Sequence, residues 1–209
     1  MTTRALRARV IAAAEAVEAS RDELCRLDAA AGDGDHGVTM ALAARAVRQT
    51  LATSPDASGA ELVTKLALAM GSVGGAIGPI YASGLRAVAG ALRALPGNEL
   101  VTVPQMLACA EAAESAIAGL GHAKPGDKTI LDALDPAIAA LRQASAAGAD
   151  LDEALDAAAV AAREGAASTA TMIASVGRAS RLGERSRGLA DPGASSFALI
   201  MAAIATSTG

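Results

Sequence analysis

Apolar residues recur at a helical spacing through most of this chain. In its first segment Leu6, Val10, Ala13 and Val17 follow the 3.6-residue period of an amphipathic helix. This periodicity and the breaks between periodic segments predict eight helices. With a capping residue counted as the first residue of its helix, they span residues 3–27, 36–53, 58–71, 79–95, 102–120, 130–147, 150–175 and 191–206. We therefore expect one all-α domain over residues 1–209.

Several of these helices begin at recognisable capping residues. In three of them a Ser, Thr or Asp is followed three residues later by Glu or Gln: Ser58 and Glu61, Thr102 and Gln105, Asp150 and Glu153. Asp191, followed by Pro192 at the first helical position, starts the last helix. Residues 96–98, which read Pro-Gly-Asn, predict a turn.

Composition agrees with a helical core. Hydrophobic residues make up 52% of the chain and aromatic residues only 1%, so Ala, Leu, Val, Ile and Met must form the interior. The net charge of −4 argues against nucleic acid as a partner. Residues 66–85 carry no charge and are long enough to cross a bilayer, but Gly71, Gly78 and Pro79 interrupt them. We expect no membrane span and a soluble, cytoplasmic protein.

The densest candidate chemistry lies in residues 27–40. Asp28, Asp33 and Asp35 come within nine residues, and Gly34 and Gly37 allow the tight turn that lets carboxylates point inward. Carboxylates this close repel one another unless a cation neutralises them, and oxygen ligands of this kind suit magnesium. A calcium EF-hand is excluded, because its sixth and twelfth positions would hold Val38 and Ala44. An Asp/Gly turn that only caps the next helix remains the alternative.

Three further stretches lie between helices. Residues 71–80 contain glycines through which backbone amides could approach an anion or a flat ring, although a close-packed helix junction would look the same. Residues 121–129 bring Lys124, Asp127, Lys128 and Thr129 together, for a phosphate or ribose contact or for an ordinary helix cap. Residues 178–187 carry four arginines in a long connection, which predicts either a functional lid or a solvated charged loop.

All four stretches follow alternate helices of the prediction. Consecutive antiparallel helices place every second junction at the same end of a bundle. The acidic, glycine-rich, lysine-bearing and arginine-bearing stretches are therefore expected to meet in one composite site.

Together these stretches resemble the L subunit of dihydroxyacetone kinase, a nucleotide-binding domain of the DhaL or Dak2 type. The resemblance rests on Leu-Asp-x4-Gly-Asp-Gly-Asp-His-Gly, Gly-Ser-Val-Gly-Gly-Ala-x-Gly-Pro, Lys-Pro-Gly-Asp-Lys-Thr, Gly-Arg-Ala-Ser-x-Leu-Gly-Glu-Arg-Ser and Asp-Pro-Gly-Ala. It covers nearly the whole chain. It implies a closed barrel of eight antiparallel helices with the nucleotide, ADP or ATP, at one end.

The resemblance also implies roles for individual residues. Asp28, Asp33 and Asp35 would hold two Mg²⁺ ions, and Arg178 would reach the phosphates as the catalytic arginine. The remaining nucleotide contacts would come from His36, Gly37, Val38, Thr39, Ala76, Ile77, Gly121, Ile130, Ala190, Asp191 and Pro192. The family commonly has Asn, Ser and Met where this chain has Thr39, Ile77 and Ile130, a difference that affects the nucleotide pocket rather than the metal site.

The implied activity is phosphoryl transfer to dihydroxyacetone or a related ketose, held on a separate K subunit, without which the chain would be inactive. A phosphotransferase-system subunit would recharge the bound ADP. The alternatives are a kinase subunit that uses free ATP, a phosphohistidine carrier at His36 and a nucleotide-sensing regulatory module. The sequence leaves a homodimer open.

Overall fold

The computed structural model describes residues 1–30, 32–95 and 101–207, and these contain helices and loops but no strand. The predicted turn at residues 96–98 lies outside them. The α-helices are α1 (Thr3–Ala19), α2 (Arg21–Ala29), α3 (His36–Ala52), α4 (Gly59–Gly71), α5 (Ile77–Ala94), α6 (Val103–Gly121), α7 (Leu131–Ala147), α8 (Leu151–Ser168) and α9 (Pro192–Thr206). Two 3₁₀ helices, η1 (Thr169–Thr171) and η2 (Arg178–Ser186), lie between α8 and α9.

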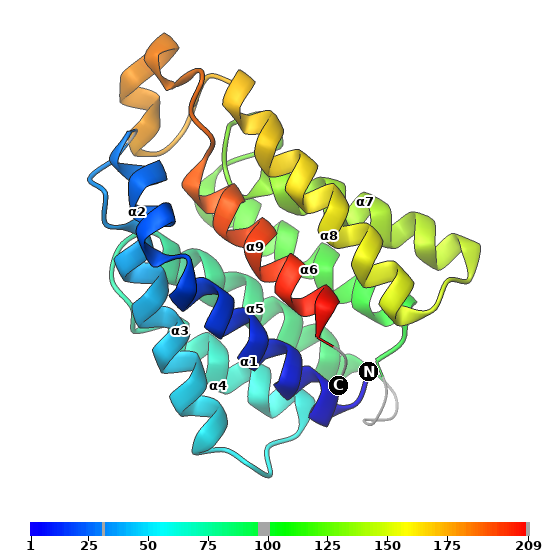
Figure 1. The fold of residues 1–209 in the computed structure, drawn as a ribbon. Coiled ribbons are helices and arrows are strands. Elements are labelled where there is room, and N and C mark those ends of the chain that lie inside the picture. Colours follow the sequence, from blue (N-terminus) through cyan, green and yellow to red (C-terminus); the bar gives the residue numbers. More distant parts are fainter. Residues whose placement is uncertain (31, 96–100, 208–209) are drawn as a thin grey trace.

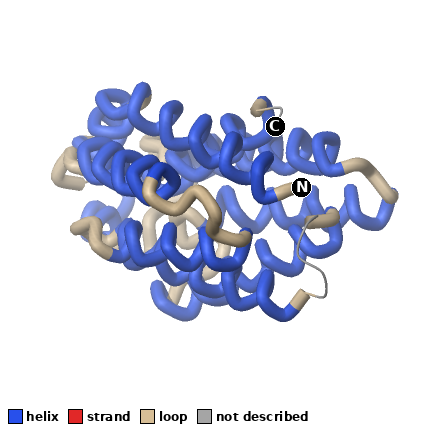
Figure 2. The backbone as a smooth tube through the Cα atoms, turned by 90° about the horizontal axis from the view of Figure 1, so that it is seen from below, coloured by secondary structure: helices blue, strands red, loops and turns tan. Residues whose placement is uncertain are grey.

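The α-helices form a closed ring. From α3 to α9 each helix packs against the next one in sequence, α1 packs against α3, and α9 returns to pack against α1. With α1 and α2 counted as one bent rod, the ring has the eight members that the sequence predicts. Figure 2 shows the same bundle from a second side. The all-α barrel expected from the sequence is therefore confirmed.

Three predicted helix boundaries were wrong. The helix expected over residues 3–27 is interrupted at Ser20, whose ψ of 9° leaves the helical range, and α2 begins afresh with Asp22 and Glu23 in its first turn. The helix expected to reach residue 175 ends at Ser168, because Thr169–Thr171 tighten into η1 and Met172 is extended. Helix α5 begins at Ile77, two residues before the predicted start, since proline is tolerated in a first turn.

Alanine lets the helices of the ring approach closely. Ala133, Ala158 and Ala162 are fully buried where α7 meets α8. At Gly165 of α8 even a Cβ atom would collide with the Asp132 carbonyl of α7. The interior is not completely filled, since an apolar cavity of about 380 Å³ lies between the helices. No helix among the described residues is both long and apolar enough to cross a membrane.

Arg9 joins both ends of the chain at the side of the barrel away from η2. Its side chain is buried, and its guanidinium group donates to the carbonyls of Ile204 and Ala205 at the end of α9 and to Asp152 Oδ1 at 2.5 Å. The last carbonyls of a helix receive no hydrogen bond from an N–H group within the helix. Arg9 therefore supplies donors to carbonyls that would otherwise lack them.

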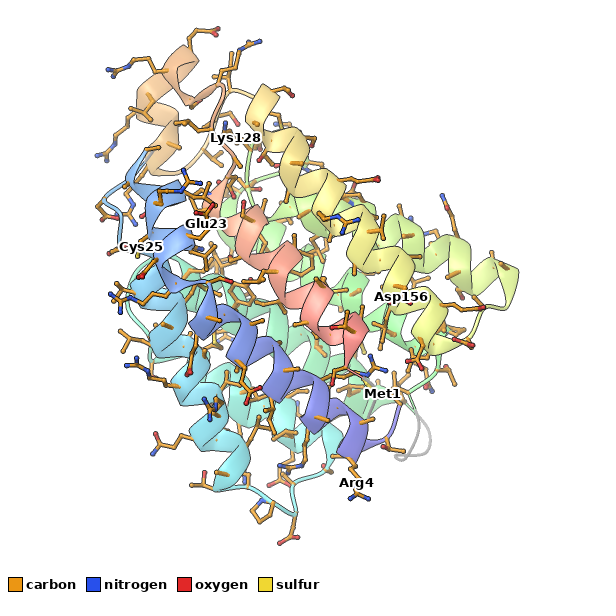
Figure 3. The ribbon with its side chains drawn as sticks, in the orientation of Figure 1. Met1, Arg4, Glu23, Cys25, Lys128 and Asp156 are labelled. Atoms are coloured by element: carbon orange, nitrogen blue, oxygen red, sulfur yellow. The ribbon has the colours of Figure 1, made fainter. Side chains whose placement is uncertain are left out.

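Arg9→Met is expected to lower the free energy of unfolding by about 1–3 kcal/mol, because it removes charge-assisted hydrogen bonds from a buried site. Urea denaturation followed by circular dichroism measures the change. Arg4→Met is the matched control, since Arg4 is exposed on the same helix (Figure 3). Equal stability of the two variants would contradict this role for Arg9.

Candidate functional site

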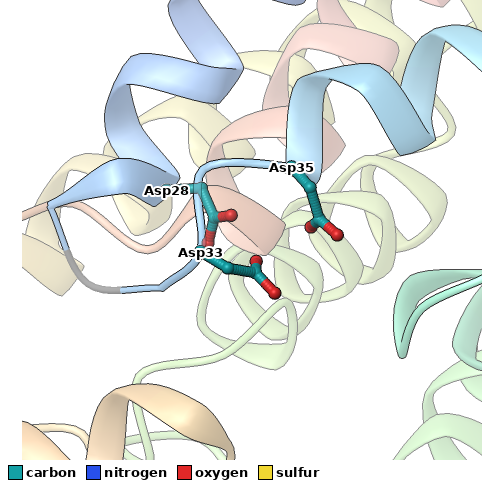
Figure 4. Close-up of side chains that lie close together, drawn as sticks. All are labelled: Asp28, Asp33 and Asp35. Atoms are coloured by element: carbon teal, nitrogen blue, oxygen red, sulfur yellow. The ribbon is translucent and has the colours of Figure 1, made fainter.

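Three carboxylates meet at one end of the barrel. Asp28 lies in the last turn of α2, Asp33 lies in the following loop, and Asp35 immediately precedes α3. One oxygen atom from each lies within 4.8 Å of the others (Figure 4). Gly34, at φ +78°, makes the turn between Asp33 and Asp35, and the His36 amide donates to Asp28 Oδ2 at 3.2 Å. The local sequence thus brings the three side chains together as the spacing predicted.

This cluster suits a divalent cation. Three negative charges within a few ångströms repel one another unless a positive charge lies among them. Arg178 supplies one positive charge, because its guanidinium group pairs with Asp33 and lies 3.8 Å from Asp35. Oxygen ligands that keep room for water and phosphate are those that Mg²⁺ prefers. The donor set therefore fits magnesium, which Asp28, Asp33 and Asp35 would hold.

A cavity of about 270 Å³ opens beside the carboxylates. The loops that follow α2, α4, α6 and η1 all contribute to its wall, so the four stretches singled out in the sequence do meet. Most of the predicted site residues line it: Asp28, Asp35, His36, Thr39, Ala76, Ile77, Gly121, Ile130, Arg178, Asp191 and Pro192.

Four predicted residues do not line this cavity. Asp33 contacts Arg178 just outside it, and Ala190 only precedes the lining residue Asp191. Gly37 is buried beneath α2, where a Cβ atom would collide with the Arg21 carbonyl, so its lack of a side chain serves helix packing. The Val38 side chain is 42% exposed. Gly37 and Val38 could contact a ligand in the cavity only through their backbone.

His36 forms the floor of the cavity next to α9. Its Nε2 atom lies 3.1 Å from Ser196 Oγ, and that hydroxyl donates its proton to the Gly193 carbonyl. This contact holds the His36 ring against α9 and engages its Nε2 atom. Burial lowers the pKa of His36 below its usual value, an effect that the Asp28 carboxylate partly offsets.

Part of the cavity wall is apolar. Ile77 and Ile130 were predicted here, and Ile80 and Ile117, which sequence reasoning missed, lie beside them. Helical spacing could have found both, because Ile80 is one turn after Ile77 and Ile117 is one turn before Gly121. A flat, weakly polar ring would fit against these side chains.

The lysine-bearing stretch folds into a stiff turn. The Asp127 carboxylate accepts from the Lys124 amide and ammonium groups and from Ser175 Oγ, and these hydrogen bonds, that from the Lys124 side chain foremost, lower its pKa to about 2. Asp132 accepts from the amides of Gly126 and Thr129. Asp127 and Asp132 thus hold the turn itself, rather than a phosphate or ribose.

Residues 169–191, which we call the arginine segment, connect α8 to α9 across the mouth of the cavity. The predicted lid is partly helical, since η2 occupies Arg178–Ser186. In Figure 1 it projects beyond the end of the barrel above α2, opposite the start of α1. Arg178, Arg181, Arg185 and Arg187 are all exposed, and Arg178 is the one that lines the cavity.

Comparison with known proteins places this geometry in a family. The family model described as DAK2 domain matches residues 30–206. The chain belongs to the DAK2 domain family. The resemblance to the L subunit of dihydroxyacetone kinase is thereby confirmed.

Relatives of this DAK2 domain include both single-domain and longer proteins. It is 36% identical to "PEP-dependent dihydroxyacetone kinase 2, ADP-binding subunit DhaL" of Listeria innocua, over 88% of this chain and 85% of that protein. It is 38% identical to human "Triokinase/FMN cyclase", over 88% of this chain but only 31% of that protein.

A solved structure shares the fold. The dihydroxyacetone kinase from C. freundii, in complex with AMP-PNP and Mg²⁺, matches with a TM-score of 0.76 and 26% identity over 100% of this chain and 34% of that one. The DAK2 domain thus corresponds to about a third of the length of that kinase.

Asp191 makes the stability of the domain depend on pH. Burial in the cavity wall raises the pKa of this carboxyl from 3.8 to about 6, although the Ala194 amide and the Lys128 ammonium group favour its charged form. Between these two values the folded state binds more protons than the unfolded state. The contribution of Asp191 to stability is therefore present in acid and is lost as the pH rises through about 6.

Asp191→Asn keeps an N-cap but cannot ionise. We expect the free energy of unfolding of Asp191→Asn minus that of the wild type to increase by up to about 3 kcal/mol as the pH rises from 4 to 7. Urea titrations at a series of pH values measure the difference. The exposed Asp156→Asn on α8 provides the control, and the same trend in both variants would count against the shifted pKa of Asp191.

Proposed function

We propose that this chain is the nucleotide-binding, phosphoryl-transferring subunit of a kinase that acts on dihydroxyacetone or a related ketose. The observation that carries the proposal is a single cavity whose wall contains Asp28, Asp35 and Arg178 of the carboxylate site together with a set of isoleucine side chains. A nucleoside di- or triphosphate has the matching polarity, with its phosphates at the carboxylates through Mg²⁺ and its base against the isoleucine side chains. Relatives named as ADP-binding subunits, which the chain matches over 85% and 88% of their length, support it.

The first turn of α3 would receive the phosphates. Amides in the first turn of a helix lack acceptors within the helix and lie at the positive end of its dipole. His36, Gly37, Val38 and Thr39 form that turn, but the His36 amide donates to Asp28 Oδ2 and the Thr39 amide to the Asp35 carbonyl. Because Gly37 has no side chain and Val38 does not line the cavity, these two residues would act through their amides. Ala76, Gly121 and Pro192 would then border the nucleotide along the cavity wall.

Arg178 would act on the phosphoryl group being transferred. The ketose hydroxyl would attack the γ-phosphorus, the bond to the ADP oxygen would break with its electrons remaining on ADP, and the hydroxyl proton would be released to water. Negative charge grows on the oxygens around phosphorus in this step, and Arg178 lies where it can neutralise that charge. Two Mg²⁺ ions held by Asp28, Asp33 and Asp35 would supply further charge neutralisation and align the phosphates.

The ketose would be held by a separate K subunit, so that this chain transfers nothing alone. We further propose that bound ADP is recharged by a phosphotransferase-system protein. The relatives matched over most of their length are named "PEP-dependent" and "PTS-dependent", which supports this source of phosphoryl groups. The alternative is free ATP. Longer relatives, such as the "L-erythrulose 1-kinase" of Mycolicibacterium smegmatis, of which the chain covers 32%, are named as kinases without a PEP- or PTS-dependent donor.

A transfer assay tests the proposal. The chain is loaded with γ-labelled ATP and Mg²⁺, separated from free nucleotide and mixed with a K subunit and dihydroxyacetone. We expect labelled dihydroxyacetone phosphate and bound ADP. Nucleotide that binds but is not transferred to any ketose would favour a regulatory module. Acid-labile label on the protein without nucleotide would favour a carrier at His36, which the engagement of Nε2 by Ser196 argues against.

A further inference from the structure

Lys128 is a charged residue enclosed by the protein. It is 3% exposed, and its φ of +62° lies in the left-handed region that residues with a side chain rarely adopt. Burial lowers the pKa of its ammonium group, and the Asp191 carboxylate partly offsets this effect. An unfavourable backbone conformation and a buried charge both cost free energy, so the surrounding contacts must stabilise Lys128 in this position.

The ammonium group of Lys128 donates to three backbone carbonyls. Its Nζ atom lies 3.2 Å from the oxygen of Met172, 2.5 Å from that of Ser186 and 2.6 Å from that of Leu189. A lysine has three N–H donors, so none is left for a ligand in the cavity. All three acceptors belong to the arginine segment, near its beginning, at the end of η2 and shortly before α9.

The arginine segment needs such an attachment. Gly177, Gly183 and Gly188 all have positive φ, and the four arginines project into solvent. Within η2 only Ser186 is buried, and there its hydroxyl accepts from the Ala174 amide at 3.0 Å. This hydrogen bond joins two parts of the segment to each other, and η2 contributes no other buried residue that could pack against the barrel.

The turn that bears Lys128 is firm enough to serve as the anchor. The hydrogen bonds of Asp127 and Asp132 described above close it on both sides of Lys128. Ser175 Oγ of the arginine segment also donates to Asp127 Oδ1 at 2.6 Å. The turn and the segment thus meet at neighbouring residues, and Lys128 supplies the contacts that reach farthest along the segment.

We propose that Lys128 is a positioning residue, whose ammonium group ties the beginning, middle and end of the arginine segment together and so holds Arg178 against the carboxylate cluster. Arg178 lies six residues after Met172 and eight before Ser186, between two of the tied carbonyls. The tie itself is a property of the free chain. Its consequence for phosphoryl transfer rests on the proposed function.

Hydrogen–deuterium exchange of the free chain tests the tie without nucleotide or partner. In Lys128→Met we expect the amides of residues 174–188 to exchange about tenfold faster or more, because three buried hydrogen bonds to a charged donor are lost. Amides of α3 to α7 should exchange as in the wild type. Lys65→Met on α4 is the matched control and should leave both regions unchanged. Unchanged exchange of residues 174–188, or loss of the barrel helices themselves, would overturn the proposal.

A chemical rescue distinguishes the ammonium group from the bulk of the side chain. Lys128→Ala removes three carbons and the nitrogen, and propylammonium supplies those same atoms. We expect propylammonium to restore slow exchange in residues 174–188 of Lys128→Ala, whereas propanol at the same concentration should not. Equal rescue by both compounds, or by neither, would overturn the assignment to the charged group.

The transfer assay then tests the consequence for Arg178. Displacing a reacting group by about an ångström costs on the order of 100-fold in rate. Lys128→Met is therefore expected to lower the transfer rate by about 100-fold while the affinity for magnesium ADP changes little. If exchange accelerates but transfer stays normal, Lys128 does not position Arg178. If the wild type transfers nothing, the proposed function fails and the exchange result still decides whether the tie exists.

Discussion

Asp33→Asn is expected to weaken magnesium-dependent ADP binding by about 100-fold or more, because it removes the charge of one of three clustered ligands. Asp33 is exposed and borders no helix interior, so the substitution should leave the barrel intact. Calorimetric titration of the nucleotide-free chain with ADP, in the presence and absence of Mg²⁺, measures the effect. Far-UV circular dichroism should not change.

The control for this prediction is Asp22→Asn. Asp22 lies on α2, is exposed and pairs with Arg21 rather than with the cluster. It should bind magnesium ADP as the wild type does. Binding that persists in Asp33→Asn, with the same dependence on Mg²⁺, would contradict the metal site assigned here.

Arg178→Ala is expected to slow phosphoryl transfer by about 1,000-fold while weakening ADP binding much less. The reason is that charge on the transferred phosphoryl group is greatest in the transition state, where the arginine is needed most. Single-turnover transfer from bound γ-labelled ATP gives the rate, and calorimetry gives the affinity.

A neighbouring arginine provides the comparison. Arg181 lies in the same turn of η2 and is exposed, but it does not line the cavity. Arg181→Ala should transfer at close to the wild-type rate. If the two variants lose the same activity, the positive charge of the segment as a whole, rather than the position of Arg178, would be responsible.

The fold followed from the sequence because its strongest signals are local and repeated. Helical periodicity and capping residues such as Thr102 and Asp150 define the rods, and both of these residues form the capping boxes that the sequence predicts. Antiparallel succession then brings alternate loops to one end. Individual helix boundaries were predicted wrongly where a continuous helix and a break in the helix differ little in free energy. Ser20 is an example, since Ser20 and Glu23 have the spacing of a capping box but the helical period of the apolar residues continues past them to Leu24 and Leu27.

Much of the candidate site also followed from the sequence. Glycines beside closely spaced aspartates allow a tight turn that brings the carboxylates together, so the cluster of Asp28, Asp33 and Asp35 could be foreseen. The role of Lys128 could not, because a lysine between an aspartate and a threonine gives no sign of its distant acceptors at Ser186 and Leu189. Contacts across 58 and 61 residues depend on tertiary structure.

The most direct test of the central claim is the nucleotide content of the purified chain. The protein is denatured, the released nucleotide is separated by ion-exchange chromatography, and magnesium is assayed in the same sample. We expect about one ADP or ATP per chain together with Mg²⁺, or stoichiometric uptake when both are added to an empty chain. A chain that contains no nucleotide and shows no binding and no thermal shift with magnesium and ADP would contradict it.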